Sequence, residues 1–155
     1  MGDQPTPSET PPSDEEREGL LAGLSESLGE ILVDSHLRPH EDLWLRVRAQ
    51  NWQDAARTAK SAGFTYFGFL SAIDWHIAPE GRYENTEFDV GLVEEDEEPI
   101  ELDASTGYAG GETRFQLLMQ LRSLDRQLGL LLKADLGEDM TVDTLRDLFP
   151  GADWH

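Results

Sequence analysis

The chain has 155 residues, of which 32 are acidic and 12 basic, and its formal net charge is −20 at pH 7. This length suffices for one domain with its own core. Nucleic acids and anionic membrane surfaces are bound by basic patches, so the charge argues against both classes of partner. The chain has no cysteine, which excludes disulfides, a thiol nucleophile and cysteine-ligated metal within it. No apolar run approaches about 20 residues, so we expect no direct membrane insertion.

Residues 1–13 are rich in Pro, Ser, Thr and acids, and they predict a disordered tail because they cannot bury enough apolar surface. The tail has neither a basic start nor an apolar segment, so it is not a secretory signal. Residues 13–16 have the S-x-x-E form of a helix capping box. Leucines at helical spacing follow and predict a helix over 14–28, weakened by Gly19 and Gly23.

The next segments predict a strand pair and a helix. Residues 30–36 and the alternating apolar residues of 43–47 indicate two strands that form a hairpin. A helix is predicted over 52–62, where alanines share a face with Trp52. Asn51 is placed to cap its start, and Gly63 stands where a left-handed C-cap belongs.

Residues 64–73 predict a buried strand with apolar residues on both faces. Residues 115–122 and 127–134 alternate apolar and polar positions over part of their length and predict a hairpin of two more strands. Thr141 is expected to cap a short final helix, which Pro150-Gly151 ends.

Between these strands, residues 79–113 contain 12 acidic residues. A strand is possible over 86–93, and residues 94–113 predict a solvated loop insertion, which is long enough to be either functional or disordered. Because hairpins dominate the element order, we predict an α+β fold with a mostly antiparallel sheet of five or six strands and helices packed on one face. The domain boundaries are expected at 14–155, after a disordered acidic, Pro-rich tail over 1–13.

Metal-binding patterns are weak. His36 and His40 have the spacing of ligands on one helix face, but Pro39 between them argues against that helix. The triplets 74–76 and 153–155 both have the sequence Asp-Trp-His. If they met in space, they could form a two-His, two-Asp metal site or serve a small hydrolase. We favour the simpler interpretation, in which each Trp closes an edge of the core and its polar neighbours cap strand and helix ends.

Other motifs also fail to indicate a catalytic or cofactor site. The acidic run 94–98 lacks the spacing of a calcium-binding loop. The Gly-rich residues 105–111 lead into a strand and carry no Lys, whereas a phosphate-binding loop is followed by a helix and usually contains a Lys. The residues therefore predict an interaction or structural domain that binds no cofactor of its own.

Three segments, in order, resemble one family. Residues 43–75 are similar to its strand, helix and strand with an acidic–aromatic end, and residues 115–136 to its hairpin. Residues 141–155 (TVDTLRDLFPGADWH) are similar to its short helix followed by Pro-Gly and Asp-Trp-His. The family is the 30-kilodalton subunit of the proton-translocating NADH:quinone oxidoreductase (respiratory complex I). The candidate interface and signature residues are Asp74, Trp75, Pro150, Gly151, Asp153, Trp154 and His155.

The resemblance implies a non-catalytic subunit of the peripheral arm, on the cytoplasmic side of the cell membrane and attached to it through the complex. Its partners would be the other peripheral-arm subunits, chiefly the quinone-site subunit. NADH, quinone, FMN and iron–sulfur clusters are implied for the complex, with none bound by this chain. A related membrane-bound hydrogenase, which uses a similar subunit, is also compatible with the resemblance.

The sequence stops at His155, before the Glu-Arg-Glu and acidic–aromatic–Gly motifs that the resemblance would place next. We therefore expect part of the docking surface to be missing, so that the isolated chain is a soluble monomer with weak or no binding to the sister subunit. The alternative is a stand-alone acidic α+β protein-binding module with no redox role.

Overall fold

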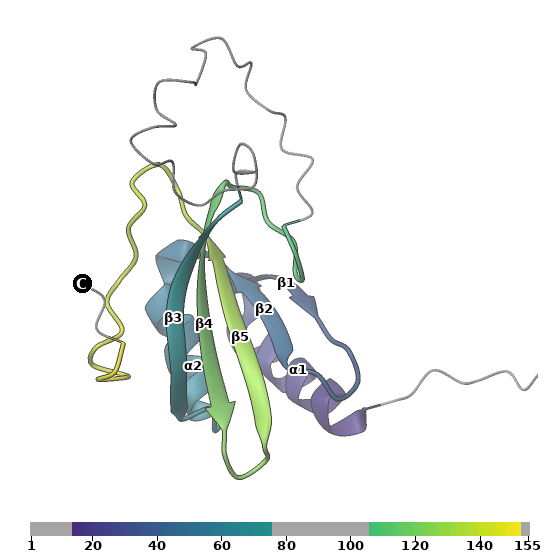
Figure 1. The fold of residues 1–155 in the computed structure, drawn as a ribbon. Coiled ribbons are helices and arrows are strands. Elements are labelled where there is room, and N and C mark those ends of the chain that lie inside the picture. Colours follow the sequence, from purple (N-terminus) through teal and green to yellow (C-terminus); the bar gives the residue numbers. More distant parts are fainter. Residues whose placement is uncertain (1–13, 76–105, 153–155) are drawn as a thin grey trace, which may run out of the picture.

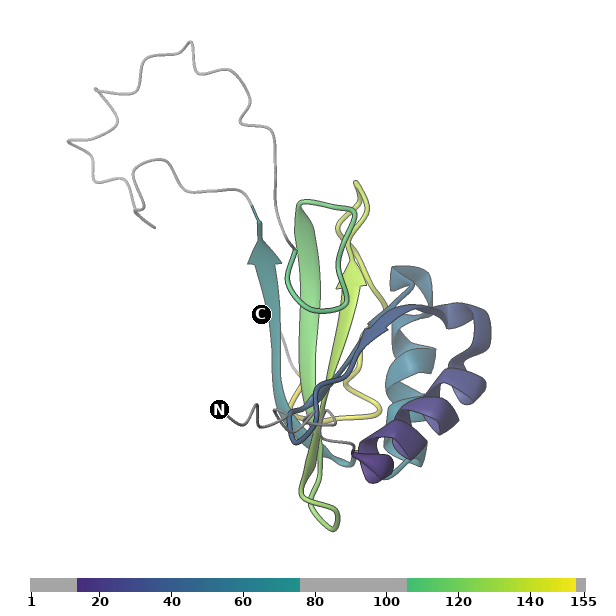
Figure 2. The same ribbon diagram turned by 90° about the vertical axis from the view of Figure 1, so that its right-hand side faces the viewer.

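A computed structural model describes residues 14–75 and 106–152 of the protein. Its sheet has five strands in the order β1-β2-β5-β4-β3, and its helices pack on one face of that sheet (Figures 1 and 2). The fold is therefore α+β with a mostly antiparallel sheet, as the sequence predicts. The elements in chain order are α1 (Glu15–Leu28), η1 (Gly29–Ile31), β1 (Leu32–His36), β2 (Leu43–Val47), η2 (Ala49–Asn51), α2 (Trp52–Ser61), β3 (Tyr66–Asp74), β4 (Phe115–Ser123) and β5 (Leu128–Asp135).

The two predicted hairpins both form, as β1–β2 and β4–β5. β3 pairs antiparallel with β4, but β2 and β5 pair parallel, with Leu45 opposite Leu132. The parallel pair arises because α2 carries the chain from β2 to the far edge of the sheet, and the β4–β5 hairpin then fills the space between β2 and β3. Local sequence patterns do not specify this insertion.

Both helices begin where the sequence predicts, although their caps differ in detail. The N-cap of α1 is Asp14, one residue after the predicted Ser13, and its carboxylate accepts a hydrogen bond from the Arg17 amide at 3.2 Å. Asn51 occupies the N-cap position of α2 but makes no side-chain capping bond. Gly63 has a φ of 98°, so the predicted left-handed end of α2 is confirmed.

The core lies between the helices and one face of β2, β5 and β4. Alternate strand residues point into it, as their period-two pattern predicts. The central buried side chains are Leu43, Leu45, Val47, Met119, Leu121, Leu128, Leu130, Leu132 and Ala134 from the strands, with Leu24, Leu28, Trp52, Ala55, Ala56 and Ala59 from the helices.

The prediction of a buried strand over 64–73 is wrong in one respect, because β3 lies at an edge of the sheet. Phe64, just before the strand, is fully buried, whereas Tyr66 and Phe69 are 52% and 39% exposed. No described residue pairs with the outer edge of β3. An apolar pattern on both faces is shared by central strands and by edge strands with exposed apolar surface, so the sequence does not separate them.

The final helix predicted from Thr141 does not form. Residues 141–145 have no regular structure, and a single turn follows, in which the Phe149 amide donates to the Leu145 carbonyl at 2.8 Å. Leu145, Leu148 and Phe149 nevertheless point into the core. A segment this short gains few helical hydrogen bonds against the cost of nucleation, and its Thr and Asp residues are poor helix formers.

Several predictions fall on residues outside those described. They are the disordered tail over 1–13, the strand over 86–93 and the larger part of the acidic insertion.

Candidate protein interface

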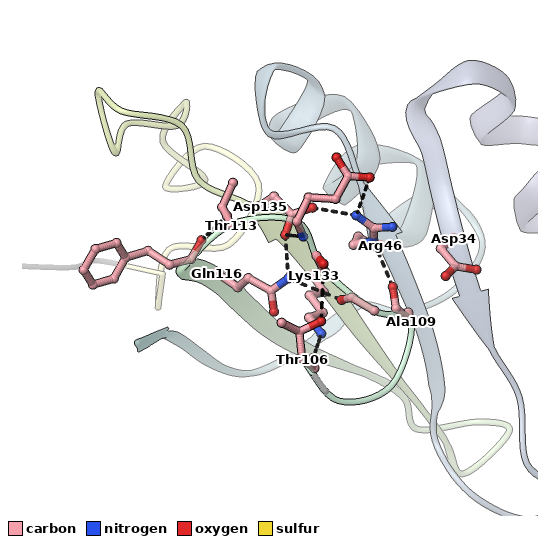
Figure 3. Close-up of polar contacts among 12 residues, drawn as sticks. Asp34, Arg46, Thr106, Ala109, Thr113, Gln116, Lys133 and Asp135 are labelled. Atoms are coloured by element: carbon pink, nitrogen blue, oxygen red, sulfur yellow. Dashed lines mark hydrogen bonds and ion pairs between the residues drawn. The ribbon is translucent and has the colours of Figure 1, made fainter. Parts of the chain in front are cut away.

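An ion pair connects β2 to the end of β5 beneath the loop 106–112 (Figure 3). Arg46 Nη1 lies 2.6 Å from Asp135 Oδ2, and Arg46 Nε donates to the Ala109 carbonyl at 2.8 Å. Asp135 Oδ1 accepts from Gln116 Nε2 at 2.5 Å and from the Glu112 amide at 3.2 Å. Burial raises the pKa of Asp135, but its hydrogen bonds from Gln116 and Arg46 outweigh that effect and leave the pKa below its ordinary value.

Lys133, on the same face of β5, also holds the loop. This residue is 1% exposed, and its ammonium donates to the carbonyls of Thr106 and Tyr108. Burial lowers the pKa of Lys133 to about 8, against an opposing effect of the nearby Asp135 carboxylate. The buried cations Arg46 and Lys133 therefore hold backbone carbonyls of the loop in place.

Aromatic contacts fix the middle of the same loop. The Tyr108 ring stacks on His36 with centroids 4.2 Å apart and meets the edge of Trp44 at 5.5 Å. The Arg38 guanidinium lies 4.7 Å from the Tyr108 ring centroid. Residues 106–112 thus pack against the sheet, and the prediction of a solvated loop does not describe them.

The histidine pair of the β1–β2 region is not brought together as a metal site. His36 stacks on Tyr108, whereas His40 is exposed and its Nδ1 lies 3.5 Å from the Asp14 carboxylate. Within 14–75 and 106–152, no three His, Asp or Glu side chains are grouped so that they could hold a metal ion.

Asp74 and Trp75 close the end of the β3–β4 pair. Asp74 receives two hydrogen bonds of 2.7 Å from the Arg114 guanidinium, and these bonds raise the pKa of Arg114. Trp75 Nε1 donates to Gln116 Oε1 at 2.7 Å, so the indole lies over the polar cluster. The ion pair of Asp74 fits the capping role that we favoured, whereas Trp75 lies over polar residues and is not part of the hydrophobic core. His76 and residues 153–155 lie outside the described part of the chain, so whether the two triplets meet stays a prediction.

Pro150 and Gly151 lie in the turn after Phe149, next to β3. A Cβ at Gly151 would be 3.5 Å from the Phe67 ring, and the rings of Phe67 and Phe149 are 5.9 Å apart. Lys60 donates to the Leu148 carbonyl at 2.5 Å. The C-terminal segment is therefore fastened to α2 and to β3 at this point.

A groove lies between the C-terminal segment and strands β3 and β4. The cavity has a volume of about 620 Å³, and Ala72 and Met140 on its walls are exposed. Sequence analysis missed it, because its walls come from residues distant in the chain that share no motif. Its main lining residues are Trp52, Leu70, Ala72, Leu117, Met140 and Leu145.

No helix among the described residues is both long and apolar enough to cross a membrane.

Chains of similar fold occur among solved structures, and two of them are as follows. The first is Nqo5 in the form of its trypsin-resistant fragment, at 15% identity over 86% of this chain and 83% of that chain, with a TM-score of 0.55. The second is a chain of the membrane-bound sulfane sulfur reductase, an archaeal respiratory membrane complex. It is 17% identical over 88% of this chain and 61% of that chain, with a TM-score of 0.53. At these identities the likenesses establish the fold alone.

No curated protein matches the sequence closely enough to count as a relative. A family model does match, described as respiratory-chain NADH dehydrogenase, 30 Kd subunit, and the match covers residues 45–155. It begins within β2 and includes every later element of the sheet and the C-terminal segment. The chain therefore belongs to the family of the 30-kilodalton subunit of the respiratory-chain NADH dehydrogenase.

Proposed function

We propose that this chain is a non-catalytic structural subunit in the peripheral arm of a proton-translocating NADH:quinone oxidoreductase, on the cytoplasmic side of the membrane. In this role it holds the quinone-site subunit and the iron–sulfur subunits in register, so that the distances between their redox centres stay constant. The observation that carries the proposal is the family match over residues 45–155.

The use of polar groups within the domain supports a positioning role. Arg46 and Lys133 are buried, and both donate to carbonyls of the loop 106–109. Asp135 in turn accepts from Gln116 and from the Glu112 amide. Satisfied polar networks of this kind favour one arrangement of sheet and loop, and a subunit that sets distances between its neighbours needs such rigidity.

Under this proposal, NADH, FMN, quinone and the iron–sulfur clusters are bound by the other subunits. The absence of cysteine in the chain is consistent with this, because iron–sulfur clusters are held mainly by cysteine thiolates. The chief partner is the quinone-site subunit. With a net charge of −20, the chain is expected to meet its partners through surfaces of theirs that carry basic residues.

The test is to capture the chain from the cells that make it. A chromosomal N-terminal tag, mild detergent solubilisation and affinity capture should recover the other peripheral-arm subunits in equal amounts, together with NADH:quinone reductase activity. Deleting the gene should remove that activity and leave the remaining subunits unassembled. Recovery of the chain without these subunits, with an intact complex in the deletion strain, would instead support the stand-alone acidic binding module.

A further inference from the structure

The groove beside β3 is a largely apolar surface, to which α2 contributes through Trp52. Leu70 and Ala72 pair with Met119 and Leu117 in the register of β3 and β4, so they lie on the core face of the sheet. In Figure 1, α2 lies behind β3 and β4, and the C-terminal segment runs beside β3. Met140 and Ala72 are exposed on the walls of this groove, which is therefore open to solvent along one side.

Trp52, one of the residues that line the groove, has an indole N–H without an acceptor among the described residues. The residue is fully buried. Buried indole N–H groups usually find a partner, because an unpaired one has lost its hydration without compensation. An occupant with a carbonyl oxygen could supply that acceptor.

The chain segment over 137–147, which forms one wall of the groove, is acidic, and we call it the acidic rim. It exposes four carboxylates and one guanidinium, on Glu138, Asp139, Asp143, Asp147 and Arg146, of which Asp143 and Arg146 line the groove itself. The field of this rim favours an occupant with basic residues at its flanks. A second copy of the chain would bring another net charge of −20, so charge disfavours self-association at this surface.

We propose that this groove docks a segment of a neighbouring subunit that is apolar in its centre and basic at its flanks. Its apolar side chains lie between Ala72 and Met140, a backbone carbonyl serves the Trp52 indole, and Lys or Arg residues meet Asp143 and the acidic rim. A polypeptide segment suits this groove because its apolar floor is open to solvent along one side and the acidic residues lie outside that floor. The identity of the occupant as a subunit rests on the proposed function.

The experiment places a charge in the groove of the full-length tagged chain. Ala72→Lys and Met140→Lys both alter exposed side chains, so the fold should be retained, which circular dichroism and thermal melting of the purified chain check. The matched control is Leu124→Lys, because Leu124 is also apolar and 63% exposed but follows β4 at the opposite end from Leu117. The readout is the amount of sister subunits captured with the chain.

We expect each groove variant to lower the captured sister subunits by about tenfold or more, while Leu124→Lys captures as much as the wild type. Asp143→Lys should lower capture and its dependence on salt, whereas Asp125→Lys at the β4–β5 turn should change neither, since only charges near the interface are felt. Two variants in the groove keep the test decisive if one of them fails to fold.

Undiminished capture by both folded groove variants would overturn the groove as a docking site and leave the proposed function standing. Failure of the wild-type chain to capture any sister subunit would overturn the proposed function itself. A dimer of the wild type that Ala72→Lys abolishes would assign the groove to a second copy. A small apolar molecule bound to the wild type but not to Ala72→Lys would likewise overturn the proposal.

Discussion

Arg46 on β2 and Asp135 at the end of β5 form a largely buried ion pair, with Nη1 and Oδ2 2.6 Å apart and side chains 9% and 19% exposed. Each partner also holds the loop 106–112, Arg46 through the Ala109 carbonyl and Asp135 through the Glu112 amide. The pair therefore joins two parallel strands and a loop from a third part of the chain. Removing one partner should therefore destabilise both strands and the loop.

Asp135→Asn is expected to lower the free energy of unfolding by about 2–3 kcal/mol, because it leaves the buried Arg46 with only the exposed Glu112 carboxylate, 3.6 Å away, as a counter-charge. Urea denaturation at pH 7 measures the effect. Asp125→Asn is the control, since Asp125 lies in the exposed β4–β5 turn and surface changes usually stay within about 0.5 kcal/mol. Equal stability of the two variants would mean that the ion pair contributes little.

The same variant tests how the contribution of Asp135 to stability depends on pH. Burial raises the pKa of Asp135, yet the hydrogen bonds from Gln116 and Arg46 hold it below the ordinary value of 3.8. A carboxylate with a depressed pKa in the folded state stabilises the protein above the unfolded pKa, and this contribution is lost as pH falls through the folded pKa. The difference in stability between wild type and Asp135→Asn should therefore shrink below about pH 4. Denaturation curves of both proteins at pH 3, 4, 5 and 7 test this, and a difference that stays constant would contradict it.

Lys133 should titrate far below an ordinary lysine, because burial lowers its pKa to about 8. The chain has two lysines, Lys60 and Lys133, so NMR of ¹³C-labelled lysine side chains resolves both, and Lys60→Arg assigns them. Between pH 8 and 10.5 the unfolded state binds more protons at this residue than the folded state, so the contribution of Lys133 to stability rises with pH there. A titration of Lys133 near 10.5 would show that the loop does not bury its ammonium.

Gly111 permits a close approach that a side chain would prevent. A Cβ at this position would lie 2.8 Å from Gln116 Cδ, so Gly111→Ala should displace Gln116 from Asp135 and from Trp75. The expected loss is about 1–3 kcal/mol, from overpacking and from polar groups left without partners. Gly137→Ala is the matched control, because its nearest neighbour would be Asp139 Oδ1 at 3.5 Å. Comparison of melting temperatures measures both, and a similar small change in each would contradict the role of Gly111.

Gln127, just before β5, has a φ of 54°, in the left-handed region that costs most residues about 1–2 kcal/mol. Gln127→Gly removes this cost, although the greater freedom of glycine in the unfolded chain offsets part of the gain. We expect a net stabilisation of about 0.5 kcal/mol, with Gln127→Ala close to the wild type. Thermal unfolding of the three proteins tests this, and a less stable glycine variant would show that the Gln127 side chain itself is needed.

Predictions from local sequence patterns succeeded where the apolar or polar character of a residue matches its burial in the folded chain. The alternation of 43–47 and the hairpin around 123–128 formed as expected, because one face of each strand is buried in the core. The predicted helix from Thr141 failed because its leucines could be buried without helical backbone. The packing of Tyr108 on His36 could not be anticipated, since no local pattern links residues so far apart. The signature residues 153–155 lie outside the described chain, and their role as an interface stays a prediction.

The sequence by itself determined the family, the α+β class and most element positions, because these depend on motifs and on the periods of two and 3.6 residues that local chain geometry imposes. Only the tertiary structure decided that β2 pairs parallel with β5, that the apolar strand β3 lies at an edge, and that a groove opens between β3 and the C-terminal segment. These features depend on which distant segments cover which surfaces, and that is settled by competition for burial over the whole chain.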